Sequence, residues 1–356
     1  MKIGLLTAYF ADYGSFYQAV SLYKYLEKQG YDVEIVNESF RYKYSPKLFV
    51  SSIAHKVMPK SILKKCCEKV TALNTYCILK SNLKDYNIAP VTFSDKKRYE
   101  KYDCVVVGSD EQWSVTNSNM KFIPDCFGKG MHCPHISYAT SGITLAPEKV
   151  EQQIKQQICD GLNGFDAVAV RDSVTAAWVK DWTDIDAEIV LDPTLLNPFF
   201  VCDDTTENKI AVYGEHFSQE QISAIKKFAC EHGMQTISIA WKHSWCDTHL
   251  NAETAEDVQK AFASASYCVS STFHGTIFSI LAHKPFASFT SELRGIKIKG
   301  LLKLLDFEDR LFDINGMMPG MGIDYTKCDE ILKKERTKSE QYILKAIETC
   351  LHGSVK

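Results

Sequence analysis

The chain has 356 residues, enough for two domains that each bury a core of their own. Apolar residues make up 45% of it and charged residues 24%, as in a typical globular protein, and no uninterrupted apolar run approaches the roughly 18 residues of a membrane span. The net charge of −3 gives no overall attraction to nucleic acid, so we expect no nucleic-acid partner.

The first forty residues predict a β-α-β unit. Residues 3–7 are apolar and strand-like, apolar side chains recur at helical spacing over residues 16–26, and a second strand follows at residues 33–36. The start of the chain reads as a strand and not as a signal peptide, so we expect a cytoplasmic protein. The first loop of such a unit lies where doubly wound sheets bind ligands, which makes Tyr13 and Gly14 candidate binding residues. Alternatively, Gly14 is there only for its backbone freedom.

A strongly basic segment at residues 41–80 interrupts this pattern, inside an insertion that we expect to extend to about residue 100. The segment carries nine lysines and arginines and a single acid, Glu68. The simplest interpretation is a helical insertion whose charges face solvent. The alternative is a surface for a polyanion or for an anionic membrane, which would place the protein peripherally at the inner membrane face.

Short apolar runs that end in polar residues resume after the insertion. The polar ends are Gly108-Ser109-Asp110, Thr140-Ser141-Gly142, Arg171-Asp172-Ser173 and Asp192-Pro193-Thr194. Because the carboxyl ends of parallel strands share one edge of a sheet, we expect these residues to line one edge.

Polar, turn-prone residues at 195–208 divide the chain. The alternating pattern on both sides predicts an α/β protein with an N-terminal Rossmann-like, doubly wound domain over residues 1–200 and a second over residues 208–320. The helical spacing at residues 328–356 predicts a C-terminal helix that packs back on the first domain.

The stretch from Ser270 to Thr276 sets one histidine, His274, between a short apolar strand and an apolar helix. Such a junction directs backbone N–H groups and the positive end of the helix toward the carboxyl edge of the sheet. The pattern indicates a site for an anion, either a phosphate or a carboxylate. The alternative is that His274, next to Phe273, is an ordinary core residue.

Several of these pieces together resemble one family. The pieces, in chain order, are Gly108-Ser109-Asp110 with Trp113, residues 136–142, Val170-Arg171-Asp172, residues 191–194, Ser270 to Gly275, and a late segment with Lys297, Leu301, Leu302 and Arg310. Their order resembles that of the polysaccharide pyruvyl transferase family, to about residue 315, with the basic segment poorly covered.

The resemblance implies a GT-B-like arrangement of two Rossmann-like domains with the active site in the cleft between them. It also implies transfer of a pyruvyl group from phosphoenolpyruvate to two hydroxyls of a glycan sugar, which forms a cyclic ketal and releases phosphate. The acceptor would be a sugar or a lipid-linked glycan of a capsule, an exopolysaccharide or a cell wall. The family's catalytic histidine corresponds to His274, and its donor-binding arginine corresponds to Arg171.

The donor carries a carboxylate and a phosphate, so its site needs cations and oriented N–H donors. We expect Arg171 to bind one of these anions and Ser109 to line the same site. His274 could supply or remove a proton, or stabilise the departing phosphate, and Asp110 is the candidate base for an acceptor hydroxyl. The phosphate is expected to bind hydroxyl or backbone groups at the junction, from Ser271, Thr272, Gly275 and Thr276.

An arginine and a helix dipole can neutralise the phosphate, so we expect no metal and no cofactor beyond the donor. Two positions depart from the family pattern. Thr272 stands where some members have arginine, and Glu111 displaces the usual glutamine by one position to Gln112. These departures keep open two alternatives: a nucleotide-sugar-dependent glycosyltransferase of the same architecture, and a non-catalytic scaffold in glycan assembly.

Overall fold

The computed structural model describes residues 1–9, 12–36, 78–79, 81–89, 97–116, 122–198, 206–290, 295–312 and 316–352. The basic segment predicted at residues 41–80 lies outside these ranges except for Ile78 and Leu79. Its interpretation as a helical insertion, and its contact with an anionic membrane, therefore stay predictions.

The first domain is built on parallel strands that are rich in valine, isoleucine and leucine, as expected for a sheet covered on both faces. Its main sheet has the order β2-β1-β3-β4, and isolated bridges between Ile136 and Ala167 and between Thr140 and Val170 continue it into the short pair β5-β6. The strands are β1 (Lys2–Leu6), β2 (Asp32–Val36), β3 (Cys104–Val107), β4 (His135–Ser137), β5 (Ala169–Val170) and β6 (Glu188–Ile189).

The helices that follow β1 and β5 begin with side-chain caps where the chain leaves the sheet. Asp12 caps α1 by accepting a hydrogen bond from the backbone N–H of Ser15, and Asp172 caps α5 in the same way through Thr175. The helices are α1 (Tyr13–Lys28), α4 (Gln152–Leu162), α5 (Ser173–Thr183) and the short α6 (Pro193–Leu196). Single turns of 3-10 helix lie at η1 (Leu83–Asp85), η2 (Pro124–Phe127) and η3 (Pro147–Lys149).

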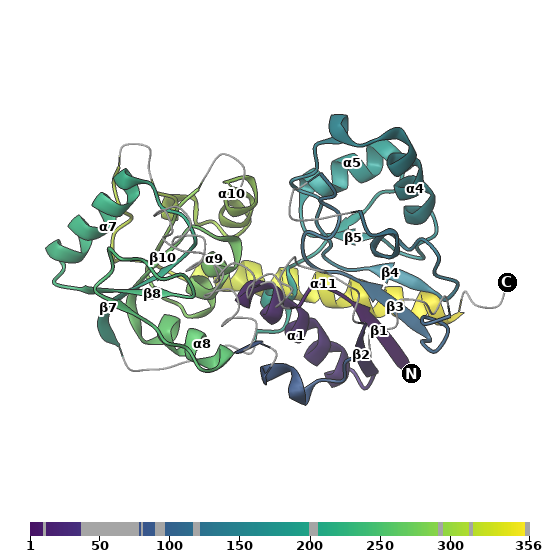
Figure 1. Ribbon diagram of the computed structural model, residues 1–356, viewed down its shortest axis with the longest axis horizontal. Coiled ribbons are helices and arrows are strands. Elements are labelled where there is room, and N and C mark those ends of the chain that lie inside the picture. The colour runs from purple at the N-terminus through teal and green to yellow at the C-terminus, as the bar shows by residue number, and fades with distance from the viewer. Residues whose placement is uncertain are drawn as a thin grey trace, which may run out of the picture.

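The second domain repeats this plan with a parallel sheet in the order β11-β10-β7-β8-β9. Its strands are β7 (Glu207–Tyr213), β8 (Gln235–Ile239), β9 (Thr248–His249), β10 (Ala265–Ser270) and β11 (Phe286–Ser288). Its helices are α7 (Gln219–Glu231), α8 (Ala255–Ser264), α9 (Phe273–Leu281) and α10 (Gly295–Leu304), and a 3-10 turn, η4, covers Glu308–Arg310. The predicted fold class, α/β with two Rossmann-like domains, is confirmed (Figure 1).

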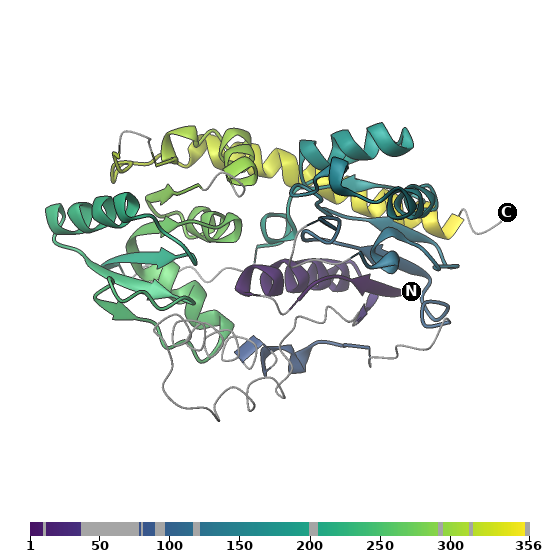
Figure 2. The ribbon, with the colours of Figure 1, turned by 45° about the horizontal axis from the view of Figure 1, so that its top comes forward.

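The last helix, α11 (Thr326–His352), extends from the second domain along the first (Figures 1 and 2). At its start, Lys327 pairs with Asp306 of the second domain at 2.6 Å. Further along, Ser339 Oγ accepts a hydrogen bond of 3.0 Å from the N–H of Leu191, and Tyr342 donates one of 3.3 Å to the carbonyl of Ser137. The helix therefore makes contacts with both domains.

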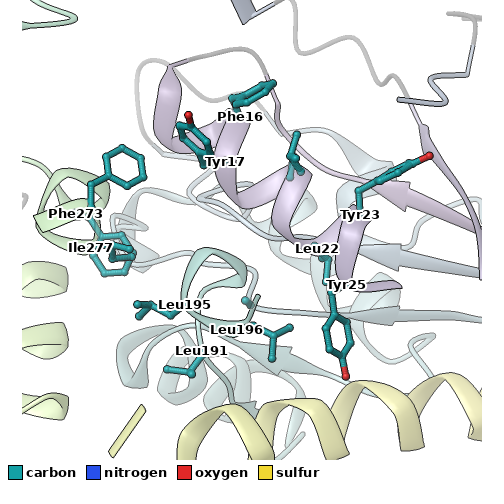
Figure 3. Packing of buried hydrophobic residues seen from close by; sticks show 14 of the residues in the cluster. Phe16, Tyr17, Leu22, Tyr23, Tyr25, Leu191, Leu195, Leu196, Phe273 and Ile277 are labelled. Carbon is teal, nitrogen blue, oxygen red and sulfur yellow. The ribbon is translucent and has the colours of Figure 1, made fainter. Parts of the chain in front are cut away.

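One apolar core runs through both domains where α1, α6 and α9 meet. The ring of Tyr17 in α1 meets that of Phe278 in α9 edge to face at 5.3 Å between centroids. Figure 3 shows Phe273 and Ile277 of α9 next to Leu195 of α6, with Phe16 and Tyr17 of α1 toward the top of the view. Burial of these side chains fixes the start of α9 against the first domain.

None of the helices in the described part of the chain combines the length and the apolar character that crossing a bilayer requires.

Candidate functional site

The start of α9 places His274 at the boundary between the domains. Thr272 is the N-cap of the helix, and its Oγ1 accepts a hydrogen bond of 3.0 Å from the N–H of Gly275. The N–H of Thr276 donates to the carbonyl of Thr272 at 3.1 Å, so the helical ladder begins there. The first two N–H groups of the helix, those of Phe273 and His274, precede this ladder.

The hydroxyls of the junction also have structural partners. Thr276 is fully buried, and its Oγ1 lies 2.9 Å from the Oγ of Ser288. Ser271 packs against Gly214, where a Cβ would come within 2.0 Å of the Ser271 Oγ. Of the groups predicted to bind phosphate here, Gly275 and Thr276 are thus engaged within the helix start.

The imidazole of His274 lies against the N-terminus of α1. A Cβ built on Gly14 would be 2.3 Å from Nδ1 of His274 and 2.5 Å from its Cγ, so only glycine permits this approach. The side chain of His274 is 13% exposed, and its Nε2 is buried without a hydrogen bond among the described residues. That nitrogen lies 3.5 Å from Oδ2 of Asp192, close enough for charge attraction but too far for good hydrogen-bond geometry.

Asp192 also binds Arg171. Its Oδ2 accepts a hydrogen bond of 2.8 Å from Nη1 of Arg171, and the two side chains are only 1% and 5% exposed. Its Oδ1 accepts from the N–H of Thr194 at 2.9 Å and caps α6. Burial alone would raise the pKa of Asp192, but the neighbouring His274 and Arg171 hold it well below its usual range. The carboxylate is therefore ionised and fixes both basic groups in place.

Arg171 is held on two sides. Its guanidinium carbon lies 4.6 Å from the ring centroid of Phe273, the residue before His274. Such stacking keeps the plane of the guanidinium in one orientation. Arg171 belongs to the first domain and Phe273 to the second, so this contact also joins the domains at the site.

Asp110 follows β3 on the first-domain edge. Its backbone has a φ of +77°, and its Oδ1 accepts a hydrogen bond of 2.8 Å from the N–H of Glu111. Burial raises the pKa of Asp110, and the positive charges of Arg171 and His274 offset only part of that rise. The turn is tight, because a Cβ on Gly108 would come within 2.2 Å of the carbonyl oxygen of Tyr138.

Glu111 pairs with Lys297 of α10 across the domain boundary. The two side chains are 15% and 16% exposed. The second oxygen of Glu111 accepts a hydrogen bond of 3.2 Å from Thr144. Burial would raise the pKa of Glu111, but the ammonium group of Lys297 outweighs that effect and lowers it.

The structure brings together His274, Gly14, Arg171 and Asp110, and it leaves Ser109 out. Ser109 is fully buried and donates its hydroxyl hydrogen bond to Gln18, which packs under the sheet edge. Tyr13, at the start of α1, is 2% exposed and belongs to the core. Gln18 of α1 thus engages the hydroxyl of Ser109, and the role of Ser109 in lining the site stays a prediction.

Sequence reasoning missed three contributors. Asp192 enters the sequence analysis as the polar end of a strand and as part of the family resemblance, Glu111 as a departure from the family pattern, and Lys297 as part of the resemblance, and none of them is given a role in the site. A carboxylate directly after a strand and before Pro193 is a signal that could have identified Asp192.

The comparison with protein families decides the identity. The model of the polysaccharide pyruvyl transferase family matches residues 12–292. The chain belongs to the polysaccharide pyruvyl transferase family. Membership implies a transferase that acts on a glycan acceptor. No curated protein matches the chain.

The solved structures similar to this family member share little sequence with it. A Glycyrrhiza uralensis protein complexed with glycyrrhetinic acid 3-O-monoglucuronide is 11% identical with a TM-score of 0.46, and the match covers 99% of this chain and 91% of that one. A UDP-GlcNAc 2-epimerase from Neisseria meningitidis is 10% identical with a TM-score of 0.45, over 98% and 94% of the two chains. The calicheamicin glycosyltransferase CalG4 is 10% identical with a TM-score of 0.43, over 99% of each chain. Likenesses this distant carry no argument about the site.

Proposed function

We propose that this protein transfers a pyruvyl group from phosphoenolpyruvate to two hydroxyls of a glycan sugar and releases phosphate. The observation that carries the proposal is the meeting of His274, Arg171 and the N-terminus of α9 at one point between the domains. An imidazole, a guanidinium and a positive helix end together suit a small ligand with two anionic groups.

Arg171 and the first N–H groups of α9 bind the donor. A guanidinium has five N–H donors, and in the part of the chain that the structure describes Arg171 donates from Nη1 to Asp192, which leaves other donors for a carboxylate or a phosphate. The stack on Phe273 limits the directions in which they point. The N–H groups of Phe273 and His274 add the partial positive charge of the helix end.

The overall reaction fixes what the side chains must do. Two hydroxyl O–H bonds and the C=C π bond of the donor break, two C–O bonds form at its central carbon, and the bond from that carbon to the phosphate oxygen breaks. One released proton ends on the methylene carbon, which becomes a methyl group, and the other leaves with the phosphate. The site therefore needs one group that takes a proton from a hydroxyl and one that delivers a proton.

We assign proton delivery to His274 and proton removal to Asp110. His274 is held by Asp192 on one side and by the close packing of Gly14 on the other, so its ring has a defined orientation. Burial makes the carboxylate of Asp110 a stronger base than an ordinary aspartate because it raises the pKa. The acceptor would be a sugar of a capsule, exopolysaccharide or cell-wall glycan, free or lipid-linked.

The test is phosphate release from phosphoenolpyruvate in the presence and absence of sugar acceptors. We expect acceptor-dependent release, and we expect His274→Ala to lower kcat by about a hundredfold or more. His283→Ala is the matched control, because that histidine is 55% exposed and pairs with Asp329 of α11 at 3.2 Å. Full activity in His274→Ala would contradict the assignment. Thermal stabilisation by a nucleotide sugar but not by phosphoenolpyruvate would instead favour a glycosyltransferase.

A further inference from the structure

The ion pair between Glu111 and Lys297 crosses the boundary between the domains within the candidate site. Ile298, Leu301 and Leu302 anchor α10 in the second domain through buried side chains. Lys297 reaches from this helix to Glu111, which follows β3 of the first domain. The pair is largely shielded from water, since about one-sixth of each side chain is exposed. An ion pair in this position interacts more strongly than one on the surface.

Lys297 belongs to the same electrostatic neighbourhood as the donor-binding arginine. The charge of Arg171 acts on Glu111 together with that of Lys297, and Glu111 in turn acts on Asp110. Each of these two cations is neutralised by a carboxylate of the first domain. Arg171 binds Asp192, and Lys297 binds Glu111.

The two ion pairs differ in how easily they can exchange partners. The carboxylate of Asp192 is fixed at both oxygens, and Arg171 is stacked on Phe273 and only 5% exposed. Lys297 carries a compact ammonium group on a flexible four-carbon stem and is three times as exposed. Lys297 is therefore the cation that can move to an incoming anion.

We propose that Lys297 is a second donor-binding cation, held by Glu111 until an anionic group of phosphoenolpyruvate takes its place. This inference rests on the proposed function, because it concerns the same donor. Phosphoenolpyruvate has two anionic groups, and Arg171 alone can satisfy only one of them well. A phosphate carries more charge than a carboxylate, so it can compete for the ammonium group. Donor binding would then use a residue from each domain.

The proposal predicts opposite effects for the two partners of one ion pair. Lys297→Met removes a group that binds the donor, so it should weaken binding. Glu111→Gln removes the group that competes with the donor for Lys297, so it should strengthen binding. If the pair served only to hold the domains together, the loss of either partner would remove the same contact and both changes would act in the same direction.

The experiment is calorimetric titration of each protein with phosphoenolpyruvate alone, without an acceptor. We expect Lys297→Met to raise the Kd about tenfold or more and Glu111→Gln to lower it about threefold. Lys338→Met is the matched control, because Lys338 pairs with Glu188 at 2.5 Å between α11 and the first domain and both side chains are nearly half exposed. Its Kd should equal that of the unchanged protein.

Raised salt separates direct contact from long-range attraction. At about 0.5 M salt the Debye length falls to roughly 4 Å, so a distant charge would lose its effect on the Kd while a contacting one would keep most of it.

Lys297→Arg retains the charge, so its Kd for phosphoenolpyruvate is expected to lie within about threefold of that of the unchanged protein. This variant guards against a folding defect in Lys297→Met.

The outcomes distinguish this inference from the proposed function. If the unchanged protein does not bind phosphoenolpyruvate, both are overturned. If it binds but folded Lys297→Met has the same Kd, the role of Lys297 alone is overturned. A higher Kd in both Lys297→Met and Glu111→Gln would likewise overturn the role of Lys297, because the pair would then act only as a structural contact.

Discussion

The two domains bring different chemistry to the site. The first domain supplies the carboxylates Asp110, Glu111 and Asp192, together with Arg171, from loops that follow strands. The second supplies His274 and Lys297 from helices. Two of the contacts between these sets are the 3.5 Å approach of His274 to Asp192 and the pairing of Lys297 with Glu111. The charge balance of the site therefore depends on the approach of the two domains.

Removing a site carboxylate of the first domain should cost more stability than weakening the part of the site in the second domain. Asp192→Asn leaves the guanidinium of Arg171 buried without a carboxylate, and we expect a loss of about 3 kcal/mol in the free energy of unfolding at neutral pH. Denaturant unfolding measures this change. Asp186→Asn is the control, since Asp186 is 86% exposed in its pair with Lys180 and should change stability by less than about 1 kcal/mol.

The stability that Asp192→Asn loses should depend on pH. The pKa of Asp192 is lower in the folded protein than in the unfolded chain. The stability that it confers is therefore complete above the ordinary aspartate pKa of about 4 and is lost as the pH falls through the lower folded value. The difference in the free energy of unfolding between Asp192→Asn and the unchanged protein should become smaller below about pH 4. A difference that is constant from pH 2 to pH 7 would contradict the ionised pair.

The approach of the domains can be disturbed by adding one methyl group. In Gly14→Ala the new Cβ would overlap the His274 ring, so the imidazole must move and we expect kcat to fall about a hundredfold. Gly300→Ala is the matched control, because a Cβ there meets nothing within 4 Å and the change should keep activity. Unchanged kcat in Gly14→Ala would show that the position of His274 does not matter.

The smallest expected effect in the second domain is the loss of the side-chain cap of α9. Thr272→Ala removes the hydroxyl that accepts the hydrogen bond from the N–H of Gly275, and we expect a loss of about 1 kcal/mol in stability. Thr272→Ser keeps that oxygen and should restore most of the loss. Thermal unfolding of the two variants side by side measures the cap, and equal Tm values would argue against it.

Much of the fold followed from local pattern. The strand predicted at residues 33–36 corresponds to β2 (Asp32–Val36), and the helical spacing at residues 16–26 falls within α1 (Tyr13–Lys28). Both depend on the period of apolar residues over a few turns or pleats, which is visible in the sequence. The His274 junction was found for the same reason.

The contacts within the site could not be predicted from local sequence patterns. Glu111 and Lys297 are 186 positions apart and meet only because two domains pack together. Ser109 follows a strand as predicted, yet Gln18 of α1 covers it, and no local pattern reveals which strand end a helix will cover. Polar residues at strand ends predict where a site lies but not which of them stay accessible.

The C-terminal helix sets limits on how the domains can move. At 27 residues, α11 is about 40 Å long, and it is bound near its start to the second domain and further along to the first. A continuous helix resists stretching, so motion that parts Lys297 from Glu111 would be a rotation in which α11 acts as the hinge, and not a separation of the two halves.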